Sequence, residues 1–263
     1  MDRPSLLSRT AAIVAAIGQD GFAPALTGLL RAVAPYTYTV IFGYCGTSRP
    51  LDLYDDFPAS KRRVFVTDYQ EGPYLLDPFY LAVARRVTAG LYRMRDLAPD
   101  RFYQGEYFRN YYVQTGLAEE IGYFTDVPGG PTVVLSLMRD ERPFSSREMR
   151  SLSEVQPLVA AGIRQHWAGL ASRFDLAAQD RQGPAQETDL ERSFHSFGDG
   201  LLTPREREIV EHTLKGHSAE AVGRILGISP GTVRIHRRNI YAKLRISSQG
   251  ELFSRFIQTL ATI

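Results

Sequence analysis

A short turn between two helical stretches near the carboxyl end constrains the fold of this chain more than any other feature. Helical residues end at Leu226, and Gly227 follows where the left-handed conformation of glycine can reverse the chain. Ser229 and Pro230 then supply a cap and a first-position proline, which is the usual start of a helix. Ile228 can fill the gap between the two helices. This local chemistry predicts a helix-turn-helix.

Helical signals on both sides of the turn predict an all-helical region. Thr203 and Pro204 combine a cap with a first-position proline, and acidic residues follow them in the first turn. Gly216 is expected to end that helix near Lys215. Further helices are expected at about 218–226, 229–244 and 249–260.

The helix expected at 229–244 has an apolar face and a polar, cationic face when its residues are spaced at about 100° each. Val233, Ile240 and Leu244 share the inner face with Arg237. Arginine can bond guanine twice and an apolar side chain can contact the thymine methyl group, although a plain solvated charged face is the alternative. The predicted DNA-binding residues are Thr232, Arg234, Ile235, His236, Arg237, Arg238, Asn239 and Lys243.

Charge is distributed unevenly along the chain. Residues 203–263 contain ten Lys and Arg against five Asp and Glu, a net charge of +5. The first 202 residues contain 21 against 24, a net charge of −3, so the total of +2 hides the asymmetry. A basic end on an otherwise acidic chain favours a polyanionic partner for that end, and double-stranded DNA is such a partner.

Four stretches carry a pattern that can be compared with known families: Leu202–Glu208, Leu226–Ser229, Thr232–His236 and Asn239–Leu244. Together they resemble the DNA-binding domain of the LuxR/NarL family of bacterial transcription regulators. The resemblance covers about a quarter of the chain, from Leu201 to Leu252. It implies a helical domain that binds DNA as a homodimer.

The resemblance also implies roles for individual residues. The expected readers of the major groove are Arg234, Ile235 and Arg238. The residues expected near phosphates are Thr232, His236 and Lys243. The fourth helix is the expected dimer contact, through Leu252, Phe253, Phe256 and Ile257. The chain departs from the family at Glu220-Ala221, where relatives usually carry Lys-Glu, and Glu220 would remove one favourable phosphate contact.

A polar segment that contains Gly, Pro and Gln divides the chain. It spans 176–199 and breaks the apolar rhythm of the residues before and after it, so it is predicted to be a linker. The predicted organisation is a sensor domain at 1–175, the linker at 176–199, and a LuxR-type helix-turn-helix domain at 200–263.

The first domain shows both helical and strand patterns. Strands are expected at 36–44, 121–127 and 132–139, with a turn at Pro128–Pro131 between the last two. The pattern predicts an α/β/α sandwich of the PAS or GAF type and an α+β class for the whole chain. Helices are expected at 5–18, 22–33, 78–87 and 106–115, and a long one opens at Phe144-Ser145-Ser146 and runs past Trp167.

Aromatic residues concentrate between residues 69 and 124, where 13 of the 28 Phe and Tyr residues fall. Such a density can line a small-molecule pocket with Tyr hydroxyls as polar anchors, or it can form an ordinary core. Asp77 precedes a proline, so it can also simply start a helix. The candidate ligand-binding residues are Tyr69, Tyr74, Asp77, Tyr80, Tyr92, Phe108 and Tyr111.

Tyr69 followed by Tyr74–Phe79 resembles the pattern of acyl-homoserine-lactone-binding domains of LuxR-type receptors. In those domains the tyrosine and the aspartate help to hold the ligand head group. This chain lacks the tryptophan usual there, since Gly90–Tyr92 stands near its place. The expected effector is therefore acyl-homoserine-lactone-like or another small metabolite.

The sequence shows no sign of catalysis or of membrane insertion. It has no metal-spaced His/Cys cluster, no Gly-rich phosphate loop and no nucleophile elbow, so no catalytic residue, metal or cofactor is predicted. The apolar run at 11–17 falls short of the roughly 20 residues of a membrane span. The single cysteine, Cys45, suits a reducing cytoplasm.

Together these patterns predict a cytoplasmic, homodimeric transcription regulator that binds double-stranded DNA, responds to a small molecule and has RNA polymerase as a further partner. Two alternatives for the first domain stay open. It can be a protein-interaction or dimerisation module without a ligand, or an enzyme fused to the DNA-binding domain.

Overall fold

The computed structural model describes residues 3–46, 48–109, 116–179, 194 and 196–260. It forms two compact units, each made of several stretches of the chain. The sheet unit comprises 1–62, 82–96 and 117–184, and the helical unit comprises 63–81, 97–116 and 185–263. Segments of the first 175 residues therefore belong to both units. The division into domains at 1–175 and 200–263 with a linker between them stays a prediction.

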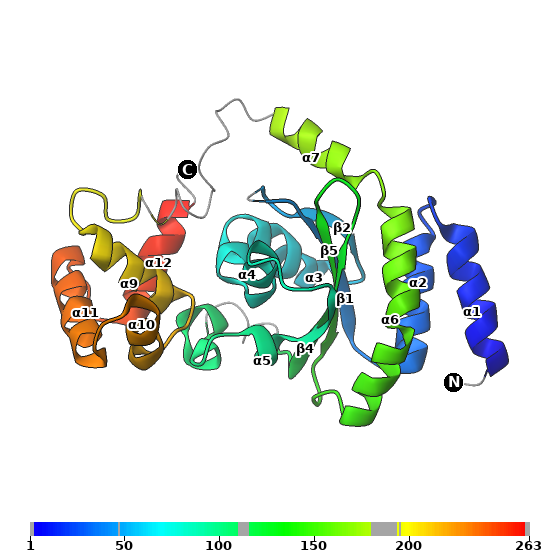
Figure 1. Ribbon diagram of the computed structural model, residues 1–263, viewed down its shortest axis with the longest axis horizontal. Helices are drawn as coiled ribbons and strands as arrows, with labels where there is room; N and C mark the ends of the chain where they lie inside the picture. Colours follow the sequence, from blue (N-terminus) through cyan, green and yellow to red (C-terminus); the bar gives the residue numbers. More distant parts are fainter. Residues whose placement is uncertain (1–2, 47, 110–115, 180–193, 195, 261–263) are drawn as a thin grey trace. The chain divides into compact units, whose positions relative to one another are not determined.

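The sheet has five antiparallel strands in the order β2-β1-β5-β4-β3 (Figure 1). Their bounds are β1 Tyr38–Tyr44, β2 Leu51–Asp55, β3 Gly90–Arg93, β4 Glu119–Asp126 and β5 Thr132–Arg139. The three inner strands are rich in β-branched and aromatic residues and are buried along nearly their whole length. This sheet with its helices, followed by a helical C-terminal region, confirms the predicted α+β class.

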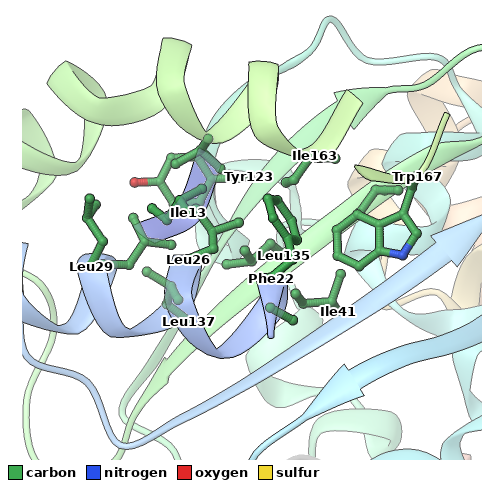
Figure 2. Packing of buried hydrophobic residues seen from close by; sticks show 14 of the residues in the cluster. Ile13, Phe22, Leu26, Leu29, Ile41, Tyr123, Leu135, Leu137, Ile163 and Trp167 are labelled. Atoms are coloured by element: carbon green, nitrogen blue, oxygen red, sulfur yellow. The ribbon is translucent and has the colours of Figure 1, made fainter. Parts of the chain in front are cut away.

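The helices α2 and α6 pack on one face of the sheet, and α1 packs on the outer side of α2 (Figure 1). The bounds are α1 Arg3–Ala16, α2 Phe22–Val33 and α6 Ser146–His166. Phe22 and Leu26 of α2 meet Ile163 of α6 and the strand residues Ile41 and Leu135 in a buried cluster (Figure 2). Each such side chain contributes about 1.5–3 kcal/mol through its burial.

The helix α6 begins at the predicted cap and ends earlier than predicted. The Ser145 hydroxyl accepts the Glu148 N–H, and the Glu148 carboxylate accepts the Ser145 N–H. The helix ends at His166 because Trp167 leaves helical geometry and packs edge-on against Phe22. A second helix, α7 Leu170–Gln179, follows and extends into the segment predicted as a linker.

Short helices lie between β2 and β4 in the sequence, on both sides of β3. Their bounds are α3 Ala59–Arg62, η1 Arg63–Asp68, η2 Pro73–Leu76, α4 Pro78–Ala84, α5 Met94–Leu97 and η3 Phe102–Gln104. α4 ends before Val87, the predicted end, because Arg86 has a left-handed φ of +55°. Residues 106–109 are helical as predicted, and 110–115 lie outside the described residues.

Helices in the C-terminal part of the helical unit follow the predicted order. They are α9 Pro204–Leu214, α10 Ala219–Leu226, α11 Pro230–Leu244 and α12 Gln249–Leu260. Thr203 forms a capping box with Glu206, and Ser229 caps α11. Gly227 ends α10 with a left-handed φ of +66°. The local signals read from the sequence therefore fix the helix ends.

Candidate nucleic-acid interface

The helix α11 has one buried face and one exposed face. Val233, Ile240 and Leu244 are buried against the other helices. Ile235 is 52% exposed on the opposite side, which is far more than an isoleucine needs for packing. The exposed side chains on that face are Arg234, Ile235, Arg238 and Asn239. The predicted division of this helix into two faces is confirmed.

The turn before α11 depends on two glycines that have different roles. Gly227 supplies the left-handed residue that reverses the chain. Gly223 allows two backbones to approach, because a Cβ there would lie 2.7 Å from the Ile228 carbonyl oxygen. The Ile228 N–H donates to the Gly223 carbonyl at 3.0 Å. The sequence pattern identified Gly227 and missed Gly223, since only the packed turn reveals that close approach.

Arg237 points into the helical unit. Its guanidinium donates to Thr213 Oγ1 at 3.1 Å and to the His217 carbonyl at 3.2 Å. Burial lowers the pKa of Arg237 from its ordinary value, but a guanidinium stays protonated. The side chain therefore joins α11 to α9 and to the turn after it, and its contact with DNA stays a prediction.

The flank of α11 carries the residues predicted near phosphates. Thr232 and His236 are half-buried, and Lys243 is exposed. The Lys243 ammonium lies 2.6 Å from the Glu206 carboxylate, which is nearly buried. Burial raises the pKa of Glu206, but hydrogen bonds from Lys243 and Thr203 hold it below its ordinary value. The charge of Lys243 is thus largely neutralised by Glu206.

The two outward arginines of α11 differ in their surroundings. Arg234 forms an ion pair with Glu220 of α10 at 2.5 Å. Glu220 is the position at which the chain departs from the family pattern, and its carboxylate pairs with a predicted base reader. Among the residues that the structure describes, Arg238 has no ion-pair partner. Arg238 is therefore the cation of this face that is most available to DNA.

The residues predicted to form a dimer contact lie mostly in the core. Leu252, Phe253 and Phe256 of α12 are no more than 7% exposed, and Ile257 is half-buried. The Phe256 ring stacks on Phe194 with centroids 4.6 Å apart. The side chains of the three buried residues already pack inside the unit, and the dimer contact through α12 stays a prediction.

Four of the candidate ligand residues lie in one short stretch of the helical unit. The Tyr69 hydroxyl donates to Asp77 Oδ2 at 2.6 Å, and the Phe79 N–H donates to Asp77 Oδ1 at 2.8 Å. The rings of Tyr74 and Tyr80 meet edge to face at 5.0 Å. Burial raises the pKa of Asp77 to about 6, although both hydrogen bonds oppose the shift. Asp77 thus contacts Tyr69 and also starts α4.

The other three candidates lie in different surroundings. Tyr92 belongs to β3 of the sheet unit, where its hydroxyl donates to the Thr88 carbonyl at 2.8 Å. Phe108 packs edge-on against Tyr103, with centroids 5.0 Å apart. Tyr111 lies outside the described residues.

Across the described residues, no three His, Cys, Asp or Glu side chains gather as a metal site. None of the helices described is long and apolar enough to cross a membrane.

The helix-turn-helix and its exposed cationic helix define the chain as a DNA-binding transcription regulator. The family described as bacterial regulatory proteins, luxR family, matches residues 200–256. An HTH-type transcriptional regulator in the exeN 3′ region of Aeromonas salmonicida is 35% identical over 188 residues, which cover 71% of this chain and 95% of that protein. The chain belongs to the luxR family, as the sequence resemblance predicted.

Two further comparisons cover parts of the chain. The monoamine regulon transcriptional regulator of Klebsiella aerogenes is 36% identical over 121 residues, which are 46% of this chain and 42% of that protein. The crystal structure of the VqsR LBD domain from Pseudomonas aeruginosa has a TM-score of 0.53 at 24% identity, and it covers 62% of this chain and 96% of that one. This second likeness concerns the fold alone.

Proposed function

We propose that this regulator binds a double-stranded operator as a homodimer through α11, under the control of a small molecule bound by its N-terminal region. The observation that carries the DNA-binding part is the exposed face of α11. Arg238, Asn239 and Ile235 face solvent there, while Val233 and Ile240 anchor the opposite side in the core.

The outward side chains of α11 suit the edges of bases in the major groove. Arg238 can donate two hydrogen bonds to guanine, Asn239 can form two hydrogen bonds with adenine, and Ile235 can contact the thymine methyl group. Each good two-bond contact supplies about 1–3 kcal/mol of discrimination against the wrong base. Arg234 is proposed as a second guanine reader, and that role requires its ion pair with Glu220 to open.

Thr232 and His236 are proposed to contact phosphates from the flank of α11. Such contacts position the helix without reading sequence, and they release counterions. Lys243 is proposed as a weaker phosphate contact because Glu206 neutralises it. A gel-shift titration tests this part: the logarithm of the binding constant should fall with the logarithm of salt concentration, with a slope of about 0.9 per phosphate contacted. Affinity that does not change with salt would contradict it.

The proposed homodimer would place two copies of α11 on half-sites about one helical turn apart. Support comes from the family, not from the buried side chains of α12. Of the four residues predicted to form the dimer contact, only Ile257 is partly exposed. Sedimentation of the full chain across a range of concentrations tests the assembly, and a single monomeric species at every concentration would contradict it.

Tyr69 and Asp77 are proposed as the polar anchors of the effector, an acyl-homoserine-lactone-like molecule or another small metabolite. A buried carboxylate needs a hydrogen-bond donor, and a ligand amide could replace the Tyr69 hydroxyl in that role. The test is a thermal-shift screen of N-acyl-homoserine lactones and related metabolites with a parallel turnover assay. Stabilisation without turnover is expected. No stabilisation would favour an interaction module, and turnover would favour an enzyme.

Action in the cytoplasm, RNA polymerase as a further partner, and the lack of catalytic activity complete the proposal. The cytoplasmic location and the RNA polymerase partner are proposed because a bacterial transcription regulator acts on chromosomal DNA. The third is tested by the same turnover assay.

A further inference from the structure

Residues 99–106, here called the docking segment, pack on the turn between α9 and α10 within the helical unit. The Arg101 N–H donates to the Gly216 carbonyl at 3.0 Å. The Ser218 N–H donates to Asp100 Oδ1 at 3.1 Å. The segment therefore binds the turn through one backbone hydrogen bond and through a carboxylate, and Asp100 and Ser218 are 118 positions apart in the sequence.

The fit between the docking segment and the turn is close. Gly216 has a φ of +93°, and a Cβ there would lie 2.9 Å from the Cα atom of Phe102. Phe102 itself is only 2% exposed. Farther along the segment, the Glu106 carboxylate lies 3.4 Å from where a Cβ on Gly250 would stand, at the start of α12. The contact thus involves a buried ring and a second carboxylate in addition to the two hydrogen bonds.

Asp100 places a negative charge at the beginning of α10. Partial burial works against ionisation, but hydrogen bonds from Ser218 and the nearby His217 hold the pKa of Asp100 below its ordinary value. In a helix-turn-helix the first helix crosses the DNA backbone, and N–H groups at helix starts donate to phosphates. The carboxylate of Asp100 therefore occupies a donor of the kind that a DNA phosphate uses.

We propose that the docking segment and the DNA backbone compete for the turn between α9 and α10, so that this contact restrains DNA binding. The inference rests on the proposed DNA binding through α11. In the docked state the Asp100 carboxylate accepts the Ser218 N–H, and its negative charge repels a DNA phosphate. Undocking frees that N–H. The segment lies between β3 and β4 in the sequence, so a change in the sheet unit has a covalent route to it.

The test measures the affinity of the full chain for a random-sequence DNA duplex at several salt concentrations. Asp100→Asn removes the charge, and Asp100→Ala also removes the acceptor. Asp96→Asn is the matched control, because Asp96 is exposed in α5 and loses the same charge outside the docking segment. Both Asp100 variants should bind about fivefold tighter than the control, and the salt slope should steepen by about 0.9, the value for one added phosphate contact.

The outcomes separate this inference from the proposed function. If wild type binds the duplex and the Asp100 variants bind no tighter than Asp96→Asn, the competition is wrong and DNA binding stands. If no version binds even at low salt, both are wrong. Circular dichroism melting checks that the variants fold. Should the Asp100 variants unfold, Glu106→Gln removes the segment's other negative charge, which faces the start of α12, and must tighten binding as well.

Discussion

Individual residues of α11 differ in how freely they can meet DNA. The Glu220–Arg234 ion pair is exposed on both sides, so solvent screens it and it can open at little cost. Arg238 needs no such exchange. Arg237, three residues after Arg234, is held by Thr213 and by the His217 carbonyl and acts as a structural residue. The three arginines Arg234, Arg237 and Arg238 of this helix thus have unequal roles.

Arg238→Ala should cost about 1–3 kcal/mol at the cognate site, because it removes a two-bond contact to a base. Gel-shift titration against the operator and against random DNA measures the change. Arg150→Ala, an exposed arginine of α6 in the sheet unit, is the control for loss of one positive charge. An equal loss on both DNAs would instead assign Arg238 to the phosphate backbone.

Asp77 should make stability depend on pH. Its pKa is raised from 3.8 unfolded to about 6 folded, so the folded state binds the extra proton between these values. Stability contributed by this group is therefore lost as pH rises from about 4 to 6, by up to roughly 3 kcal/mol. Urea unfolding of wild type and Asp77→Asn at a series of pH values measures the difference, which should change between pH 4 and 6 and become independent of pH below pH 4. Parallel profiles for the two proteins would refute this.

Elements with strong local signals could be predicted from the sequence, and elements set by neighbours could not. The caps at Ser145, Thr203 and Ser229 depend on residues three positions apart, so their pattern is visible in the chain. The strands β2 and β3 are short edge strands with only half-buried residues, and they were missed. The family resemblance implied a dimer contact through α12, and the sequence could not show that Phe194 stacks on Phe256 of that helix.

The tight turn before α11 yields a prediction about glycine. Gly223→Ala should destabilise the helical unit by about 1–3 kcal/mol, because the added Cβ meets the Ile228 carbonyl oxygen at 2.7 Å. Gly231→Ala is the matched control, since its Cβ would meet only Ser229 Oγ at an ordinary 3.5 Å. Urea unfolding followed by circular dichroism compares them. Equal stabilities would show that the turn relaxes around the new methyl group.

For the whole molecule, the boundary indicated by charge and linker composition differs from the boundary between the two compact units. The basic region at 203–263 carries the proposed interface, yet the docking segment from the acidic first region belongs to the same helical unit. The sequence predicted two consecutive domains because the polar composition of residues 176–199 is visible locally in the chain, whereas contacts between distant stretches are not. The docking segment could not be predicted, because its contacts join residues far apart in the chain.

The most direct test of the central claim, that the exposed face of α11 reads duplex DNA, is a nuclease footprint of the full chain on the DNA flanking its gene. The account predicts two protected half-sites with centres about 10 base pairs apart. Protection should disappear in the Arg234→Ala, Arg238→Ala double variant while its melting curve matches wild type. Unchanged protection by that variant, or no protection by wild type at low salt, would contradict the account.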